Sequence, residues 1–173
     1  MMMIELERTY LAKELPDLNN CKFKEIIDVY HPKSKPHPSL RIRKNGNKCE
    51  ITKKEPINND ASHQEEQTII ITEEEFNELT KLEGKKVHKI RYYYDYNGKT
   101  AEIDVFQGPL KGLVLVDFEF ESSEEKDSFE IPDFCLAEVT QEIFAAGGWL
   151  AGKSYEDIES DLKRFNYKKL VLV

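Results

Sequence analysis

The stretch Ile4-Glu5-Leu6-Glu7-Arg8 alternates strictly between apolar and charged residues. Successive side chains of a β-strand point to opposite faces of a sheet, so the pattern predicts a strand with Glu5 and Glu7 on one face. Taken alone, two glutamates on one face are typical of a strand whose outer side meets solvent. A function is indicated only if other strands repeat the pattern.

Five further segments repeat this alternation. Of the six strands, three carry acidic residues on the charged face and three carry basic or polar ones. Because some of the six strands are acidic and others basic, the pattern suggests that their charged faces point toward one another. The five segments are Arg41-Ile42-Arg43, Ile51-Thr52-Lys53-Lys54, Lys89-Ile90-Arg91, Glu102-Ile103-Asp104 and Asp117-Phe118-Glu119-Phe120-Glu121.

Composition narrows the class of protein. A chain of 173 residues with 39% hydrophobic residues fits one domain, expected over residues 1–173. The net charge of −8 disfavours nucleic acid or an anionic membrane as a partner, since both need a basic face. The three cysteines share no metal-ligand spacing, no apolar run spans a membrane, and charge begins at Glu5 where a signal peptide would be apolar. We therefore expect reduced thiols in a cytoplasmic protein.

Two Asn-Gly pairs predict β-hairpins, because both residues tolerate the backbone of tight two-residue turns. One hairpin joins residues 39–44 to 48–54, and the other joins 87–96 to 99–106. Together with the remaining strands, we expect seven or eight strands in all, most of them joined as antiparallel neighbours. The remaining strands are expected at 3–11, 22–30, 64–71 and 112–121.

Helices are expected where capping residues precede an apolar stripe. Thr72 and Glu75 form a capping box for a helix that carries Phe76, Leu79 and Leu82 and ends at Gly84. Ser122 begins a short second helix. The other expectations are a helical turn and loop at 13–19, a polar loop at 55–63, helical structure from Leu136 interrupted at Gly147-Gly148, a helix from Tyr155 to Phe165, and a strand or loose tail at 168–173.

Several residues have side chains suited to binding but offer no pattern. His31 and His37 lie in a proline-rich loop without a carboxylate at metal-ligand spacing, so we interpret them as exposed loop residues. Trp149 and Tyr93 are able to stack on an organic group, although such residues more often serve plain packing.

The charged faces have an energetic consequence. If the apolar faces pointed inward, the helices would have little to pack on. If the sheet closes with the charges inside, the helices cover the apolar outside, but buried charges are costly unless they are paired or hold ions. Carboxylates hold hard divalent cations, and Arg and Lys hold phosphate oxygens, so a mixed interior suits a metal–polyphosphate complex.

The motifs now resemble a known family. Glu5-Leu6-Glu7-Arg8 is similar to the Glu-x-Glu-x-Lys signature of the CYTH superfamily, the triphosphate tunnel metalloenzymes. The resemblance continues in order through the five segments above, Gly112-Leu113 and Glu138-Val139-Thr140, from about residue 3 to 160. It implies an α+β fold with an eight-stranded antiparallel closed β-barrel, a charged interior and helices packed outside.

The resemblance also implies roles for individual residues. One departure stands out, because the lysine of the signature falls on Thr9 and Arg8 has the wrong parity to replace it. The expected metal ligands for Mg²⁺ or Mn²⁺ are Glu5, Glu7 and Glu119, with Asp104 and Asp117 as additional ones. The expected phosphate-binding residues are Arg41, Arg43, Lys54, Lys89 and Arg91, and the expected catalytic residues are Glu5, Glu7, Lys54 and Arg91.

The function implied is metal-dependent hydrolysis of a triphosphate compound, with water attacking the terminal phosphate. The substrate would be inorganic tripolyphosphate, a nucleoside triphosphate or thiamine triphosphate. Two alternatives stay open: an adenylate cyclase on the same scaffold, and a polyphosphate-binding module without catalysis, which Thr9 favours. We expect a monomer or homodimer. The sequence has no Gly-rich phosphate loop, so side chains must hold the phosphates.

Overall fold

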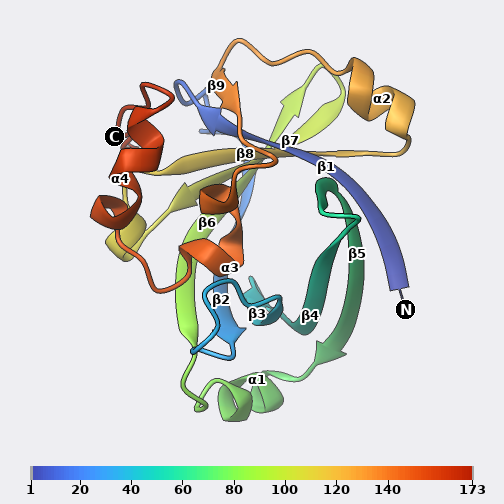
Figure 1. Cartoon of the computed structure of the whole chain (residues 1–173), viewed down its shortest axis with the longest axis vertical. Helices are drawn as coiled ribbons and strands as arrows, with labels where there is room; N and C mark the ends of the chain where they lie inside the picture. Colours follow the sequence, from blue (N-terminus) through green and yellow to red (C-terminus); the bar gives the residue numbers. More distant parts are fainter. Residues whose placement is uncertain (1, 173) are drawn as a thin grey trace.

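Eight antiparallel strands close into a barrel because β1 pairs with both β5 and β8 (Figure 1). In this computed structural model, which describes residues 2–172, the order around the barrel is β5-β4-β3-β2-β6-β7-β8-β1, and a short ninth strand, β9, pairs with the end of β1. This confirms the predicted fold class. The strands are β1 (Met2–Ala12), β2 (Lys22–His31), β3 (Leu40–Asn45), β4 (Lys48–Ile57), β5 (Asp60–Ile71), β6 (Lys85–Tyr96), β7 (Lys99–Phe106), β8 (Val114–Phe120) and β9 (Cys135–Glu138).

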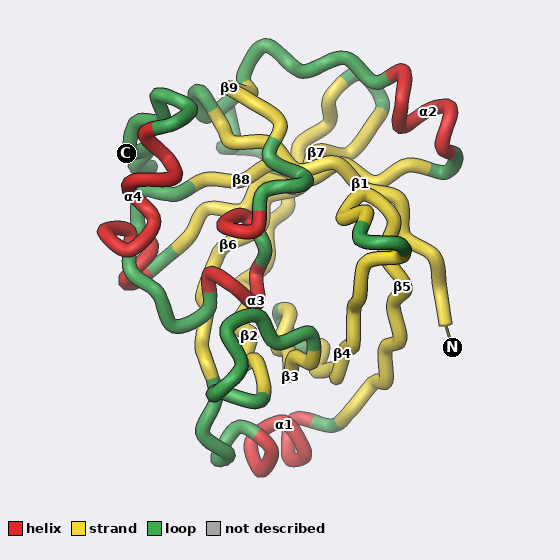
Figure 2. The backbone as a smooth tube through the Cα atoms, in the orientation of Figure 1, coloured by secondary structure: helices red, strands yellow, loops and turns green. Residues whose placement is uncertain are grey.

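Helices are few and short, as the tube in Figure 2 shows. The capping box at Thr72 and the cap at Ser122 are both present. Among residues 2–172, the chain offers no helix of the length and apolarity that a bilayer crossing requires. The helices are α1 (Glu73–Leu79), α2 (Ser123–Ser128), α3 (Gly147–Leu150) and α4 (Tyr155–Lys163), with 3₁₀ turns at Gly108–Leu110 and Ile143–Ala145.

The apolar residues form two main clusters that place the helices. Outward-facing residues of the barrel wall, such as Ile103, Val116 and Phe118, are buried under Phe134 and the segment that follows α2. A second cluster joins α3 and α4 to inward-facing residues at one end of the strands, including Phe106 and Leu115. The interior is therefore charged in its middle and apolar at the end beneath α3, which refines the prediction of a charged interior.

The polar loop predicted at 55–63 is wrong. β4 continues to Ile57 and β5 begins at Asp60, so the two strands form a third hairpin. Asn58 and Asn59 make its turn, with φ angles of 53° and 60°. Asparagine accepts this left-handed backbone more readily than other residues with a side chain, so Asn-Asn serves here in place of Asn-Gly.

Several predicted boundaries also change. The helical structure expected from Leu136 is instead β9, then a loop and a 3₁₀ turn before α3 begins at Gly147. A strand of four residues is too short to show a period of two, and its pairing with distant β1 is what stabilises it. The first helix ends at Leu79 and not at Gly84, residues 13–19 contain no helix, and residues 168–172 form no strand, with Val173 outside the described residues.

The hairpin at Asn58-Asn59 yields a stability prediction. Asn59→Ala places a β-carbon in the left-handed region without the local hydrogen bonding of asparagine, so it should lower the free energy of unfolding by about 1 kcal/mol. Asn59→Gly, the matched control, should equal or exceed the parent. Urea unfolding measures both, and an alanine variant as stable as the glycine variant would contradict this account of the turn.

Candidate functional site

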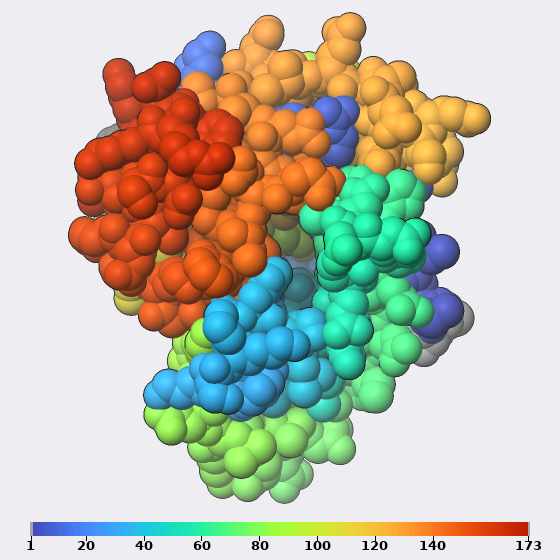
Figure 3. Space-filling model, viewed as in Figure 1, coloured from blue at the N-terminus to red at the C-terminus, as the bar shows by residue number. Residues whose placement is uncertain are grey.

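The inward faces of the strands enclose a cavity of about 530 Å³. Its mouth lies between the loop after β2, the β4–β5 turn and the segment before α3, where the space-filling view is hollowed (Figure 3). The strand register brings the predicted residues to a common interior, since Glu7 lies opposite Glu119 and Arg91 opposite Asp104. All the predicted residues line this cavity, namely Glu5, Glu7, Arg41, Arg43, Lys54, Lys89, Arg91, Asp104, Asp117 and Glu119.

Three glutamates gather on one wall of the cavity around a single lysine. The Lys54 ammonium contacts Glu5 and lies 2.9 Å from Glu7 Oε2. Burial raises the pKa of Glu7 to about 7, with the charges of Glu5 and Asp117 adding to the effect. Burial, a hydrogen bond with Glu5 and nearby acids raise the pKa of Glu119 to about 8. This wall therefore carries more carboxylate than Lys54 neutralises.

Arg91 and Lys89 share Asp104 at the centre of the cavity. Arg91 Nε and Nη2 donate to the two oxygens of Asp104 at 2.7 and 2.8 Å, and Lys89 contacts the same carboxylate. These cations hold the pKa of Asp104 well below its usual range despite burial. Burial and the charges of Arg91 and Arg43 lower the pKa of Lys89, so three cationic side chains lie close together in this part of the cavity.

The two arginines of β3 have different surroundings. Arg43 is buried and donates from Nε and Nη2 to both oxygens of Asp28, at 2.6 and 2.8 Å. That pairing lowers the pKa of Asp28 to about 2 against the effect of burial. Arg41 makes no ion pair with any other residue in the part of the chain that the structure describes, and its buried Nε has no hydrogen-bond partner there. Arg41 is thus the guanidinium left over for a ligand.

Thr9 faces the cavity, as the alternation of β1 predicted. Its hydroxyl donates to Asp117 Oδ1 at 2.6 Å, and its backbone N–H donates to Thr140 Oγ1 at 3.0 Å. Arg8 lies on the outer face, where it pairs with Glu138 and donates to backbone carbonyls at the end of α2. Arg8 therefore does not supply the charge that the signature lysine would bring, and Thr9 orients Asp117 instead.

The predicted metal ligands are gathered but lack a ready coordination geometry. Within residues 2–172, no three His, Cys, Asp or Glu side chains are arranged so that they could together hold a metal ion. The ammonium of Lys54 lies against Glu5 and Glu7, and Asp104 is already occupied by Arg91 and Lys89. Metal binding by these residues stays a prediction.

The sequence analysis assigned no site role to some residues that line the cavity. Glu102 contacts Arg91, and Asp28 holds Arg43. Both had a signal in the sequence: Glu102 alternates with Asp104, and Asp28 is an acid that interrupts the apolar run of residues 26–30. Tyr30, Glu66 and Thr140 were also missed, because a lone inward residue is indistinguishable from an outward one without its partner strand.

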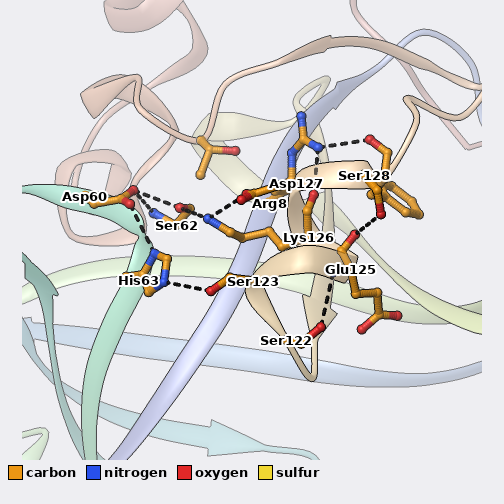
Figure 4. A network of polar contacts seen from close by, with 12 residues as sticks. Arg8, Asp60, Ser62, His63, Ser122, Ser123, Glu125, Lys126, Asp127 and Ser128 are labelled. Atoms are coloured by element: carbon orange, nitrogen blue, oxygen red, sulfur yellow. Dashed lines mark hydrogen bonds and ion pairs between the residues drawn. The ribbon is translucent and has the colours of Figure 1, made fainter.

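A polar network beside the mouth of the cavity fixes the β4–β5 turn (Figure 4). Asp60 Oδ1 accepts from Ser62 N at 2.9 Å and from Gln141 Nε2 at 2.8 Å. The buried Lys126 of α2 donates to Ser62 Oγ at 2.7 Å. The turn is thereby tied both to α2 and to the segment before α3, so two sides of the mouth are held to each other.

A closed antiparallel barrel whose interior opposes carboxylates to guanidinium and ammonium groups defines the class of triphosphate tunnel proteins. No protein-family profile matches the chain. An inorganic triphosphatase from Nitrosomonas europaea is 30% identical over 142 residues, which are 81% of this chain and 91% of the relative. With that identity and coverage, the chain belongs to the triphosphate tunnel (CYTH) family.

Solved structures agree with this assignment. A crystal structure of an inorganic triphosphatase superposes with a TM-score of 0.64 at 28% identity, covering 86% of this chain and 95% of the other. A putative adenylate cyclase from Bacillus halodurans superposes with a TM-score of 0.51 at 16% identity, covering 99% and 95% of the two chains. The second similarity shows the fold alone.

The glutamate wall predicts an unusual pH dependence of stability without metal. From about pH 5 to 8, the folded protein keeps protons on Glu7 and Glu119 that the unfolded chain has released. The free energy of unfolding should therefore fall as pH rises through this window, with Glu7 contributing about 3 kcal/mol. Asp28 and Asp104 titrate below the window and do not offset the loss.

Urea unfolding in the presence of a chelator measures this slope, and Glu7→Gln should flatten it because glutamine does not titrate. A free energy of unfolding that rises from pH 5 to 8 in the parent would contradict the assignment.

Proposed function

We propose that this protein hydrolyses inorganic tripolyphosphate with the help of a divalent cation. The observation that carries the proposal is the division of one cavity into a wall of glutamates and a cationic side with a free guanidinium, Arg41. The relative named inorganic triphosphatase supports the choice of substrate. A triphosphate with its cation brings both signs of charge, and so it complements both sides.

Four residues are proposed to bind the phosphates: Arg41, Lys54, Lys89 and Arg91. Asp104 and Glu102 hold the guanidinium of Arg91 in a fixed orientation at the cavity wall. Such preorganised cations stabilise negative charge that develops during phosphoryl transfer. Arg43 donates two hydrogen bonds to Asp28, and we therefore assign it a structural role in the cavity wall and not a role in binding phosphate.

Glu5, Glu7 and Glu119 are proposed to hold the cation, with Asp117 beside them. The fit rests on their chemistry: all donors are carboxylate oxygens, the ligands of Mg²⁺ and Mn²⁺, and burial together with neighbouring acids raises the pKa values of Glu7 and Glu119, so a bound cation would stabilise their ionised forms. When bound, such a cation neutralises phosphate oxygens and lowers the pKa of a water molecule. Asp104, held by Arg91 and Lys89, is assigned to positioning these cations.

A phosphate-release assay tests the proposal. Tripolyphosphate, ATP and thiamine triphosphate are each supplied with Mg²⁺, with Mn²⁺ or with chelator. We expect metal-dependent release, fastest with tripolyphosphate, and a loss on the order of a hundredfold in Glu7→Gln with the fold retained by circular dichroism. Formation of cyclic AMP would indicate the cyclase alternative, and tight binding without any turnover the non-catalytic one. Undiminished release in chelator would contradict the metal role.

The two arginines of β3 provide a matched pair of variants. Arg41→Ala removes a guanidinium that has no ion-pair partner among the described residues, so it should raise KM for tripolyphosphate about tenfold to a hundredfold with little change in stability. Arg43→Ala leaves Asp28 buried without its partner and should cost about 3–5 kcal/mol of unfolding free energy. Steady-state kinetics and urea unfolding separate the effects, and the reverse pattern would refute the assignment.

Two further proposals concern the protein in the cell. We propose a cytoplasmic protein, supported by three free cysteines in the part of the chain described here, which suit a reducing compartment. We propose a monomer or homodimer that acts on a small molecule, without nucleic acid or membrane. Analytical ultracentrifugation would distinguish the two oligomeric states.

A further inference from the structure

Three lysines gather beside the mouth of the cavity in a protein whose net charge is −8. We call Lys35, Lys85 and Lys153 the mouth cations. They lie around His37, which lines the opening and whose pKa is lowered by burial and by these three charges. The side chain of Lys85 lies against Gly152, the neighbour of Lys153. Among residues 2–172, none of the three lysines forms an ion pair with a carboxylate.

Lys85 extends the inward-facing row of β6 that includes Arg91 and Lys89. It lies opposite Tyr30, a residue of the cavity wall. Its ammonium donates to the carbonyl oxygen of Lys35 at 2.7 Å. A carbonyl orients the ammonium but leaves its charge unneutralised, so cationic groups continue from the inside of the barrel to its mouth.

Lys153 follows α3 and lies beside the start of β6, because the backbone N–H of Gly152 donates to the carbonyl oxygen of Lys86 at 2.8 Å. Its ammonium donates to the carbonyl oxygen of Trp149 at 2.8 Å and lies 4.0 Å from the centre of the indole ring. Asp157 acts on Lys153, but its carboxylate already accepts hydrogen bonds from the backbone and hydroxyl of Ser154. Lys153 is thereby held in place without a dedicated counter-ion.

We propose that Lys85, Lys153 and His37 form an outer anion-binding site that takes phosphate groups of linear polyphosphates longer than tripolyphosphate. The inference rests on the proposed function, because the cations inside the cavity must hold one end of the polyphosphate. A linear polyphosphate carries negative charge at every unit, so the part that emerges from the cavity meets the mouth cations.

The same geometry disfavours an organic group at this position. A nucleobase needs an exposed aromatic face for stacking. The ammonium of Lys153 lies over one face of the Trp149 indole, and neither Trp149 nor Tyr93 is among the described residues that line the cavity. The observations thus favour a continued chain of phosphates over a nucleoside.

Charge also distinguishes the mouth from the depression beside β7 and β8, which shares Glu102 and Glu119 with the cavity. Glu121 and Glu125 line this depression too, and its one lysine, Lys99, is paired with Glu125. The acidic depression repels a polyanion and the mouth cations attract it, so a long polyphosphate extends out through the mouth.

Isothermal titration calorimetry of catalytically blocked protein tests the site. Glu7→Gln serves as the background, and tripolyphosphate and a longer linear polyphosphate are titrated separately. On this background, Lys85→Ala with Lys153→Ala should weaken binding of the longer chain about tenfold more than binding of tripolyphosphate. Lys85→Arg with Lys153→Arg should retain the preference. Lys22→Ala, an exposed lysine at the other end of β2, is the matched control and should change neither constant.

The outcomes are distinguishable from those of the proposed function. A length-dependent loss in the alanine variant supports the outer site, even if no phosphate release is found with any substrate. Equal losses for both ligands, or no loss, would overturn it, even if the protein hydrolyses tripolyphosphate. A loss in Lys22→Ala as large as that in the double variant would show only a general charge effect and would also overturn it.

Discussion

The pairing of Arg91 with Asp104 is the interaction on which the interior depends. A barrel that turns its charged faces inward removes many ions from water, and each costs several kcal/mol unless a partner compensates it. Arg91 meets this requirement with two parallel hydrogen bonds to Asp104 and further contacts with Glu102 and Asp117. Arg43 and Asp28 repeat the arrangement on neighbouring strands.

The charges inside the barrel are not all paired, and the excess carboxylates lie in a different part of the cavity from the unpaired guanidinium. Glu5, Glu7 and Glu119 share one lysine, whereas Arg41 has no ionic partner among the described residues. An interior built only for stability would pair these groups with each other or replace them by apolar residues. Their separation stores binding free energy for a ligand that carries both a cation and phosphates, which is the physical basis of the proposed triphosphatase activity.

Apolar packing provides the rigid frame for this interior. Aromatic and aliphatic residues on the outside of β7 and β8 are buried beneath the segment that follows α2, and α3 with α4 close the apolar end. The polar network of Asp60, Ser62 and Lys126 then holds the β4–β5 turn in place. Because strands and not loops carry most of the charged residues, their positions are set by backbone pairing.

The sequence by itself determined the strands, two of the hairpins and the face on which each charged residue lies. Those features are local: alternation reports a strand, Asn-Gly reports a turn, and parity assigns Glu5, Arg41 and Arg91 to one interior. The sequence did not reveal β9 or the Asn58-Asn59 turn, because the first depends on pairing with a distant strand and the second uses a less common turn pair.

Only the tertiary structure decided which charged side chains are paired within the protein and which remain available to a ligand. Arg41 and Arg43 are two residues apart with the same parity, and nothing local separates them. Asp28 lies opposite Arg43 across the β2–β3 pair and neutralises it, while the residue opposite Arg41 is Tyr30, which has no charge to offer. Register between strands is a non-local property, and the electrostatic role of each residue follows from it.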